Sequence, residues 1–135
     1  MILIDSNILM YAAGADHPHK SPSVAVLERI AGGEVEAVIN AEVLQEILHR
    51  YRSIRRWGDG RRVYDLTRQL FPIVLPVTAA ALDRARDLLD RVASIMARDA
   101  VHAAVVLTEG LEAVCSYDKD FDRIPGIIRL EPDAT

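Results

Sequence analysis

The sequence predicts an α/β domain in which helices cover both faces of a central sheet. Short apolar runs of strand length alternate along the chain with longer amphipathic segments, the pattern of strand and helix units that share one sheet. Half of the 135 residues are hydrophobic, which is enough material for one core, and we expect a single domain over residues 1–135. Two of the apolar runs stop close to a carboxylate, at the end of a strand where an open parallel sheet places its ligand site.

The residues at their ends identify the first predicted strand and the helix that follows it. Residues 2–4 are an apolar run that stops at Asp5, as a buried strand does. Residues 16–22 are expected to be a loop, and Ser21-Pro22-Ser23 supplies a cap and a first-turn proline for a helix. That helix is predicted to end at the glycine pair 32–33.

A second strand and its helix come next. Residues 35–39 form the strand, and Asn40 caps a helix that is predicted for residues 41–56. The segment Gly58-Asp59-Gly60 is expected to end this helix. A third helix then continues to Pro72.

The second half of the chain alternates in the same way. A strand is predicted at residues 73–75 between two prolines, followed by an amphipathic helix over residues 79–92. Residues 100–107 are almost all apolar and form a buried helix, and short strands follow at 113–115 and 127–128. The apolar stripe of the amphipathic helix consists of Leu82, Ala85, Leu89 and Val92.

Composition excludes several classes of protein. Cys115 is the only cysteine, so one chain offers neither a disulfide nor a thiolate zinc site. The first apolar run lacks a basic segment before it, and no apolar run reaches the roughly 18 residues that span a membrane. We therefore expect a cytoplasmic protein with no membrane partner.

Arginines cluster in one segment of a chain whose net charge is −4. Six arginines and a single acid, Asp59, lie between residues 50 and 62. Guanidinium groups bind phosphate and stack on bases, so this segment is a candidate phosphate-contact surface. A solvated helix face with extended arginine side chains is the alternative. The candidate contacts are Arg52, Arg55 and Arg56, together with Lys119 further along the chain.

Four acids are predicted to meet at one edge of the sheet. Asp5 and Asp118 each follow an apolar strand, and Asp99 stands at the start of the buried helix, where the helix dipole stabilises a carboxylate. Taken alone, Asp5 and Asp99 are equally well explained as helix caps. The helix over residues 41–56 offers Glu46, which borders its apolar stripe, and Glu42, which lies almost opposite, so Glu46 is the better candidate.

Carboxylates that share a small volume need a counter-charge, because otherwise one of them takes up a proton. A divalent cation supplies that charge, and all-oxygen ligation favours Mg²⁺ or Mn²⁺ over zinc or copper. The usual use of such a cluster is phosphodiester chemistry with metal-activated water. The predicted metal-binding and catalytic residues are Asp5, Glu46, Asp99 and Asp118.

Other titratable residues near these acids have ordinary explanations. His102 lies one helical turn after Asp99, but a single histidine in an alanine- and valine-rich helix is more often a core residue than a ligand, and we expect a core role. Asp120 either supports a second metal or is a solvated charge in a turn, and the sequence leaves both open. Asp122 is expected to be solvated.

The ordered motifs of the chain resemble those of the PIN-domain ribonucleases, and its size and tail are similar to the VapC toxins of toxin–antitoxin pairs. The resemblance covers essentially the whole chain. It implies a three-layer αβα PIN-like fold with a mainly parallel sheet, RNA cleavage that depends on Mg²⁺ or Mn²⁺, homodimers, and a VapB-like antitoxin that occupies the active-site groove. The motifs are Ile4-Asp5-Ser6-Asn7, Leu44-Gln45-Glu46, Arg98-Asp99-Ala100-Val101-His102-Ala103-Ala104, and Ser116-Tyr117-Asp118-Lys119-Asp120-Phe121-Asp122 followed by Gly126.

The resemblance also implies roles for individual residues. The four acids named above bind the metal, and the arginine cluster guides RNA toward them. Ser6-Asn7 stands where the family often has Thr-Asn, and Ser116 where it often has Thr; the hydroxyl is kept, so these residues support the acids. Apolar surface on the helix that carries Leu44, Leu48 and Tyr51 is expected to hold part of the antitoxin.

Two alternatives belong to other classes of function. A catalytically silent RNA- or protein-binding module on the same fold would keep the acids only as caps, and capping does not require all four. A phosphatase with Asp5 as its nucleophile would need a second aspartate two residues later, where this chain has Asn7. The sequence therefore favours a metal-dependent endoribonuclease.

Overall fold

Five short strands form one parallel sheet in the computed structural model, which describes residues 1–135. They are β1 (Ile2–Ile4), β2 (Ala37–Asn40), β3 (Val74–Leu75), β4 (Val114–Cys115) and β5 (Arg129–Leu130). The order across the sheet is β3-β2-β1-β4-β5, so the chain builds outward on one side of β1 and then crosses to the other. The order reverses between β1 and β4, and a parallel sheet places its ligand site beyond the carboxyl ends of the strands at such a point.

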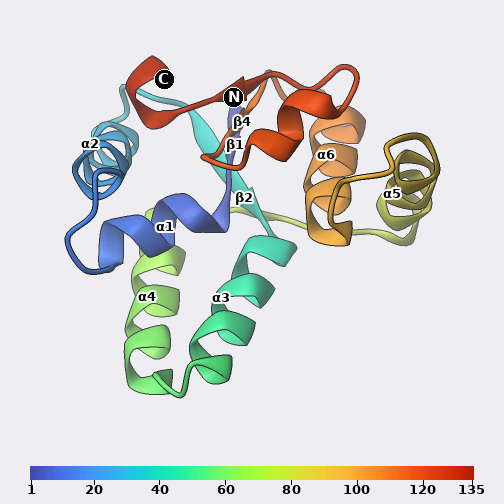
Figure 1. Cartoon of the computed structure of the whole chain (residues 1–135). Coiled ribbons are helices and arrows are strands. Elements are labelled where there is room, and N and C mark those ends of the chain that lie inside the picture. Colours follow the sequence, from blue (N-terminus) through green and yellow to red (C-terminus); the bar gives the residue numbers. More distant parts are fainter.

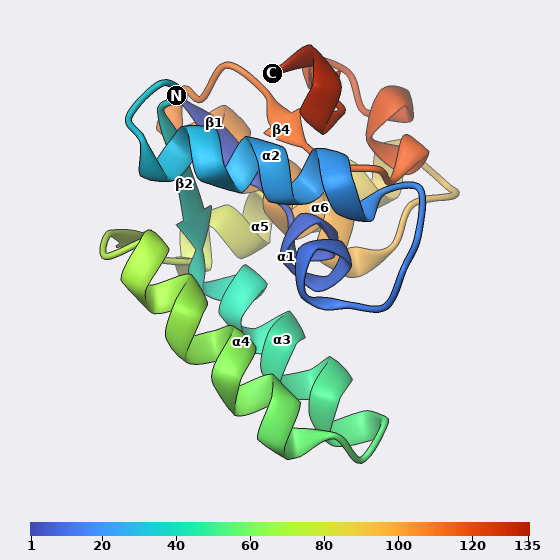
Figure 2. The same ribbon diagram turned by 90° about the vertical axis from the view of Figure 1, so that its left-hand side faces the viewer.

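Helices cover both faces of this sheet (Figures 1 and 2), which confirms the predicted three-layer fold. They are α1 (Ser6–Ala13), α2 (Lys20–Ala31), α3 (Ala41–Ser53), α4 (Trp57–Leu70), α5 (Ala79–Arg91) and α6 (Ala97–Glu109), with 3-10 helices η1 (Lys119–Arg123) and η2 (Pro132–Ala134). Side chains alternate along β1, so Ile2 and Ile4 join the core under α1 to α4, while Leu3 joins the core under α5 and α6. None of the helices combines the length and the apolarity that crossing a membrane requires.

Two helices begin directly after strands, and the residue at the junction caps each of them. Asp5 directly follows β1 and caps α1, and its Oδ1 accepts a hydrogen bond of 2.7 Å from the Ser6 amide. Asn40 ends β2 and caps α3, as predicted, because its Oδ1 accepts a bond of 3.1 Å from the Val43 amide. Both helices therefore start at the carboxyl edge of the sheet, beside the switch point, where the strand order reverses between β1 and β4.

Helices α3 and α4 form an arm that projects away from the sheet (Figures 1 and 2), and they are joined by residues 54–56. The predicted break at Gly58-Asp59-Gly60 is wrong, because these residues form the first turn of α4. Gly60 is required by packing: a β-carbon built there would lie 2.4 Å from Cβ of Tyr51 on α3. The change of direction is made by Arg55, whose φ is +58°.

Three further predictions differ from the structure in detail. Helix α2 starts at Lys20, inside the segment expected to be a loop. The last strand is β5, two residues beyond the predicted 127–128. The buried stripe of α5 consists of Ala81, Ala85 and Leu88, whereas Leu82 and Leu89 are exposed; Ala85 and Leu88 belong to the core that α6 also lines.

Candidate active site

The four predicted acids line one cavity of about 510 Å³ at the carboxyl edge of the sheet. Asp5 follows β1, and Asp118 lies just beyond β4, the strand that pairs with β1. Glu46 comes from the second turn of α3, and Asp99 from the first turn of α6. Four elements far apart in the sequence thus bring their carboxylates to the switch point.

Asp5 is buried, and both of its carboxylate oxygens accept hydrogen bonds. Besides the Ser6 amide, Ser116 Oγ donates to its Oδ2 at 2.6 Å, and Asn7 Nδ2 donates to the same oxygen at 3.2 Å. Burial raises the pKa of Asp5 and the neighbouring charge of Glu46 adds to this rise, against the opposing effect of His102 and of these hydrogen bonds. The predicted supporting residues Ser6, Asn7 and Ser116 therefore all contact an acid of the cavity.

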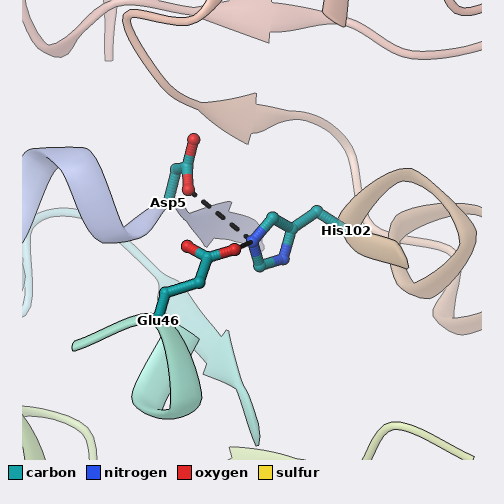
Figure 3. A group of neighbouring side chains, drawn as sticks. All are labelled: Asp5, Glu46 and His102. Carbon is teal, nitrogen blue, oxygen red and sulfur yellow. Dashed lines mark hydrogen bonds and ion pairs between the residues drawn. The ribbon is translucent and has the colours of Figure 1, made fainter. Parts of the chain in front are cut away.

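Glu46 is buried at 9% exposure, and both of its oxygens accept hydrogen bonds. His102 Nε2 lies 2.9 Å from Oε1 (Figure 3), and Ser6 Oγ donates to Oε2. Burial alone would raise the pKa of Glu46, but the bond from His102 and the charge of that ring, with the bond from Ser6, outweigh it and lower the pKa. Glu42 is only partly buried and does not line the cavity.

Asp99 and Asp118 form the other half of the cluster, together with Asp120. One carboxylate oxygen of each lies within 4.8 Å of the others. Burial, followed by the nearby carboxylates of Asp118 and Asp5, raises the pKa of Asp99 to about 8. Asp118 caps η1 by accepting the Asp120 amide at 2.9 Å, while Asp120 forms an ion pair with Arg123.

A divalent cation fits this set of donors. Asp99 Oδ2 is buried and has no hydrogen-bond partner, which is costly for a carboxylate oxygen unless a cation or a donor faces it. Burial and neighbouring carboxylates raise the pKa values of Asp5 and Asp99, and a bound cation would oppose both effects. Carboxylate oxygens are the ligands that Mg²⁺ and Mn²⁺ prefer.

His102 is the residue whose place at the site the sequence did not indicate. It is fully buried, as a core residue is, but its ring also lies against Asp5 and Glu46, two of the acids that line the cavity. Nε2 lies 2.9 Å from Glu46 Oε1 and 3.7 Å from Asp5 Oδ1, and Nδ1 lies 3.0 Å from Asn40 Nδ2. The sequence signal was its position one turn after Asp99 on a buried helix, which gives the face but not the partners.

Arg50 is the one member of the predicted arginine cluster that lines the cavity, and His49 and Arg98 line it as well. His49 and Arg50 line it from α3, one turn beyond Glu46, and Arg98 lines it from α6. The predicted contacts Arg52, Arg55, Arg56 and Lys119 do not line it. The first three belong to the far end of α3 and the connection to α4, and Arg56 pairs there with Asp59.

Comparisons with known proteins agree with this architecture. Residues 2–127 match the PIN domain family. The chain is 43% identical to ribonuclease VapC13 of Mycobacterium tuberculosis over 96% of its length and 99% of that protein. It is 35% identical to ribonuclease VapC23 of the same species over 87% of its length and 93% of that protein.

Two solved structures share the fold. VapBC2 from Rickettsia felis, crystallised with a DNA fragment from its promoter, superposes with a TM-score of 0.76 at 20% identity and covers 97% of this chain and 98% of that chain. FitAcB from Neisseria gonorrhoeae superposes with a TM-score of 0.75 at 19% identity, and both chains are covered completely. The same sheet and helices thus occur in proteins whose sequences have diverged widely.

Proposed function

Since the chain belongs to the PIN-domain family and to its VapC ribonucleases, we propose that the acidic cavity hydrolyses RNA phosphodiester bonds with a bound Mg²⁺ or Mn²⁺. The protein is an endoribonuclease of the toxin type, which is paired with an antitoxin. The observation that carries the proposed chemistry is the convergence of Asp5, Glu46, Asp99 and Asp118 on one cavity.

The four acids would hold the cation, which when bound supplies an activated water and neutralises charge on the phosphate. The hydroxyls at the site serve the acids: Ser6 donates to Glu46, and Ser116 donates to Asp5. Neither hydroxyl is positioned as a nucleophile, so a water would attack the phosphorus and one P–O ester bond would break, which leaves a phosphate on one RNA fragment and a hydroxyl on the other. Arg98 and Arg50 flank the acids and attract the phosphate backbone, which the acids alone would repel.

The test of this proposal is RNA cleavage by the purified chain. We expect cleavage of single-stranded RNA in Mn²⁺ or Mg²⁺, and its loss in excess chelator with recovery when the cation is restored. Binding of RNA without cleavage in either cation would instead favour the silent module. Expression of the chain alone is expected to arrest growth, and co-expression of its antitoxin to restore it.

Arg50 and Arg98 give a second prediction. Each Arg→Ala variant is expected to weaken RNA binding and to lower the slope of log affinity against log salt by about 0.7, the value for one contact to a single strand. Binding is measured with Asp99→Asn present throughout, so that the RNA stays intact. Arg84→Ala on the exposed face of α5 is the control and should leave the slope unchanged.

The variant with Arg52, Arg55 and Arg56 all replaced by alanine tests whether RNA contacts the arm formed by α3 and α4. If the slope falls, RNA extends from the cavity along α3 to its far end. If only Arg50 and Arg98 change the slope, the arginines near the turn are a solvated surface. An unchanged slope in every variant would contradict phosphate contact at the cavity walls.

An apolar groove between α1, α2 and α4 is the surface that we propose for the antitoxin. Leu44 and Tyr51 on α3 are buried, and of the helix face predicted for this partner only Leu48 is exposed, by 40%. The groove instead has a volume of about 190 Å³, and seven of its eight lining residues are hydrophobic, with Leu66 exposed by 63%. Helix α1 separates this groove from the acidic cavity, so one peptide can contact both.

We also propose that the protein forms a homodimer, as the family resemblance implies. Apolar side chains remain exposed on the opposite side of the sheet, on and after α5, and are available for such an interface. They are Leu82, Leu89 and Met96.

A further inference from the structure

Four aromatic side chains from three segments of the chain form one cluster beside the acidic cavity. They are Tyr11 on α1, His17 and His19 in the connection between α1 and α2, and Tyr117 just beyond β4. The ring centroid of Tyr11 lies 4.7 Å from that of His17, 5.0 Å from that of His19 and 5.5 Å from that of Tyr117. His19 and Tyr117 are stacked, with centroids 3.6 Å apart and an interplanar angle of 11°.

This cluster is a local concentration of rings in a chain that has few of them. Phe, Trp and Tyr together make up 5% of the sequence, yet two of the four tyrosines and two of the four histidines meet here. None of them is a core residue, because His17 is exposed and the other three members are half-buried. Burial in the core therefore does not explain why they are together.

Tyr11 connects the cluster to the cavity. Asn7, Met10 and Tyr11 line the cavity from α1, at positions i, i+3 and i+4, which share one face of a helix. Asn7 donates to Asp5 Oδ2 at 3.2 Å, and Tyr11 lies one turn further, about 6 Å along the helix. Met10 and Tyr11 are the two hydrophobic residues among the twelve that line the cavity. The cavity thus has one apolar wall, and that wall leads from the acids to the aromatic cluster.

Hydrogen bonds order the cluster in the protein alone. Lys20 Nζ donates to the Gly14 carbonyl, which joins the two ends of the connection between α1 and α2. Within this connection, the His19 amide donates to His17 Nδ1 at 3.0 Å. A surface that is already ordered loses little conformational entropy when a ligand binds to it.

An RNA strand has the two kinds of surface that this cavity can contact. Its phosphates are charged, and Arg50 and Arg98 lie in the cavity wall to attract them. Its bases have flat faces that stack on aromatic side chains, and this contact tolerates any sequence because every base has such a face. The apolar wall at Tyr11 is the part of the cavity that suits a base.

We propose that the aromatic cluster stacks one unpaired base of the RNA next to the bond that is cut, with Tyr11 as the ring that contacts the base. The inference rests on the proposed function, which makes RNA the ligand of the cavity. Bases inside a duplex are paired and stacked on one another, so they cannot turn toward Tyr11. The substrate of this site is therefore a single strand or a loop.

The test compares two chains that carry the same charge. One is labelled oligouridine, and the other is the same ribose–phosphate chain without bases. Binding is measured with Asp99→Asn present throughout, so that the RNA stays intact. Stacking of one base on an aromatic side chain contributes roughly 5- to 150-fold in affinity, so we expect oligouridine to bind at least about fivefold more tightly.

Variants at position 11 assign this preference for bases to the cluster. Tyr11→Ala is expected to lose most of the preference but to keep its affinity for the base-free chain and its salt slope, because no phosphate contact is removed. Tyr11→Phe keeps the ring and is expected to keep the preference. Tyr64→Ala is the matched control, since Tyr64 is a half-buried tyrosine on α4 that does not line the cavity.

Photochemical crosslinking locates the base without any change to the cluster. Oligouridine that contains one iodouridine is irradiated on the protein, and the crosslinked peptide is identified by mass spectrometry. We expect the crosslink at Tyr11 or at a neighbouring member of the cluster, His17 or Tyr117. Crosslinks confined to residues outside the cluster would overturn the inference.

Two binding results would overturn it as well. One is equal affinity for oligouridine and the base-free chain while the cluster is unaltered. The other is a preference for bases that Tyr11→Ala leaves intact, in which case the cluster packs the connection to α2 or contacts a protein. Neither result concerns hydrolysis. A protein that shows the expected preference and crosslink but, with Asp99 restored, leaves RNA intact in Mn²⁺ would contradict the proposed function alone.

Discussion

Asp99→Asn is expected to reduce RNA cleavage at least about a hundredfold and, at the same time, to raise the thermal stability of the metal-free protein at pH 8. Activity falls because the cation loses a charged ligand. Stability rises because the buried Asp99 Oδ2 has no partner, and an amide in its place relieves repulsion from Asp118 and can donate to it.

The raised pKa of Asp99 determines the direction in which stability changes with pH. The pKa of Asp99 is about 8 in the folded protein, against an ordinary value of 3.8, so between these values the folded state holds a proton that the unfolded chain has released. The stability contributed by that proton is fully present below about pH 4 and is lost as the pH rises through about 8. The raised pKa of Asp5 acts in the same direction.

Thermal unfolding of the metal-free protein at several pH values measures the effect. The unfolding temperature of the wild type should be lower at pH 8.5 than at pH 5. This decrease should be smaller in Asp99→Asn, by at least about 3 °C. Added Mn²⁺ should restore the wild type at the upper pH and have much less effect on the variant. Equal pH profiles for the two proteins would show that ionisation of Asp99 does not destabilise the metal-free protein.

Glu46→Gln is expected to abolish cleavage, whereas Glu42→Gln, one turn earlier on the same helix, keeps it. Glutamine retains an oxygen that accepts from His102, and its NH₂ can donate to Ser6 Oγ, so both contacts at position 46 can be kept, the second with donor and acceptor exchanged, while the charge is lost. Glu42 is partly exposed and lies outside the cavity, so its charge does not contact the cation.

The two variants are compared by kcat/KM on one RNA and by Mn²⁺ affinity. A loss in Glu46→Gln of both quantities, with wild-type values for Glu42→Gln, would establish that charge at position 46 is required. If the ranking were reversed, the predicted phase of α3 would be wrong in solution. Unfolding midpoints close to the wild type in both variants exclude a general loss of structure.

Local signals account for the part of the fold that the sequence predicted. Asp5 and Asn40 each end an apolar run and cap a helix, so both the strand and the start of the helix could be placed from neighbouring residues. The placement of Asp5 and Asp118 at the same edge of the sheet followed from a general property of parallel sheets. These features need no knowledge of distant contacts.

Tertiary contacts decided what the sequence did not reveal. Gly60 suggested a helix end, but its missing side chain makes room for Tyr51 on a neighbouring helix. The arginines near the turn were close to Glu46 in the chain, yet a helix advances about 1.5 Å per residue, which places Ser53 at the end of α3 roughly 10 Å beyond Glu46 and the turn beyond that. His102 could be assigned to the core, but its partners Asn40 and Glu46 lie 62 and 56 residues away.

The crossing of the chain from β3 to β4 has a consequence for the synthesis of the protein. A ribosome that has made α1 to α5 has produced Asp5 and Glu46, but β4 does not yet exist to pair with β1, and Asp99 and Asp118 are absent. Contacts such as the bond from Ser116 to Asp5, 111 residues apart, form only after both ends of this span have emerged. If the four acids act as proposed, a growing chain lacks two of them until residue 118 has left the ribosome, and we expect it to be unable to cleave the messenger RNA that encodes it before then.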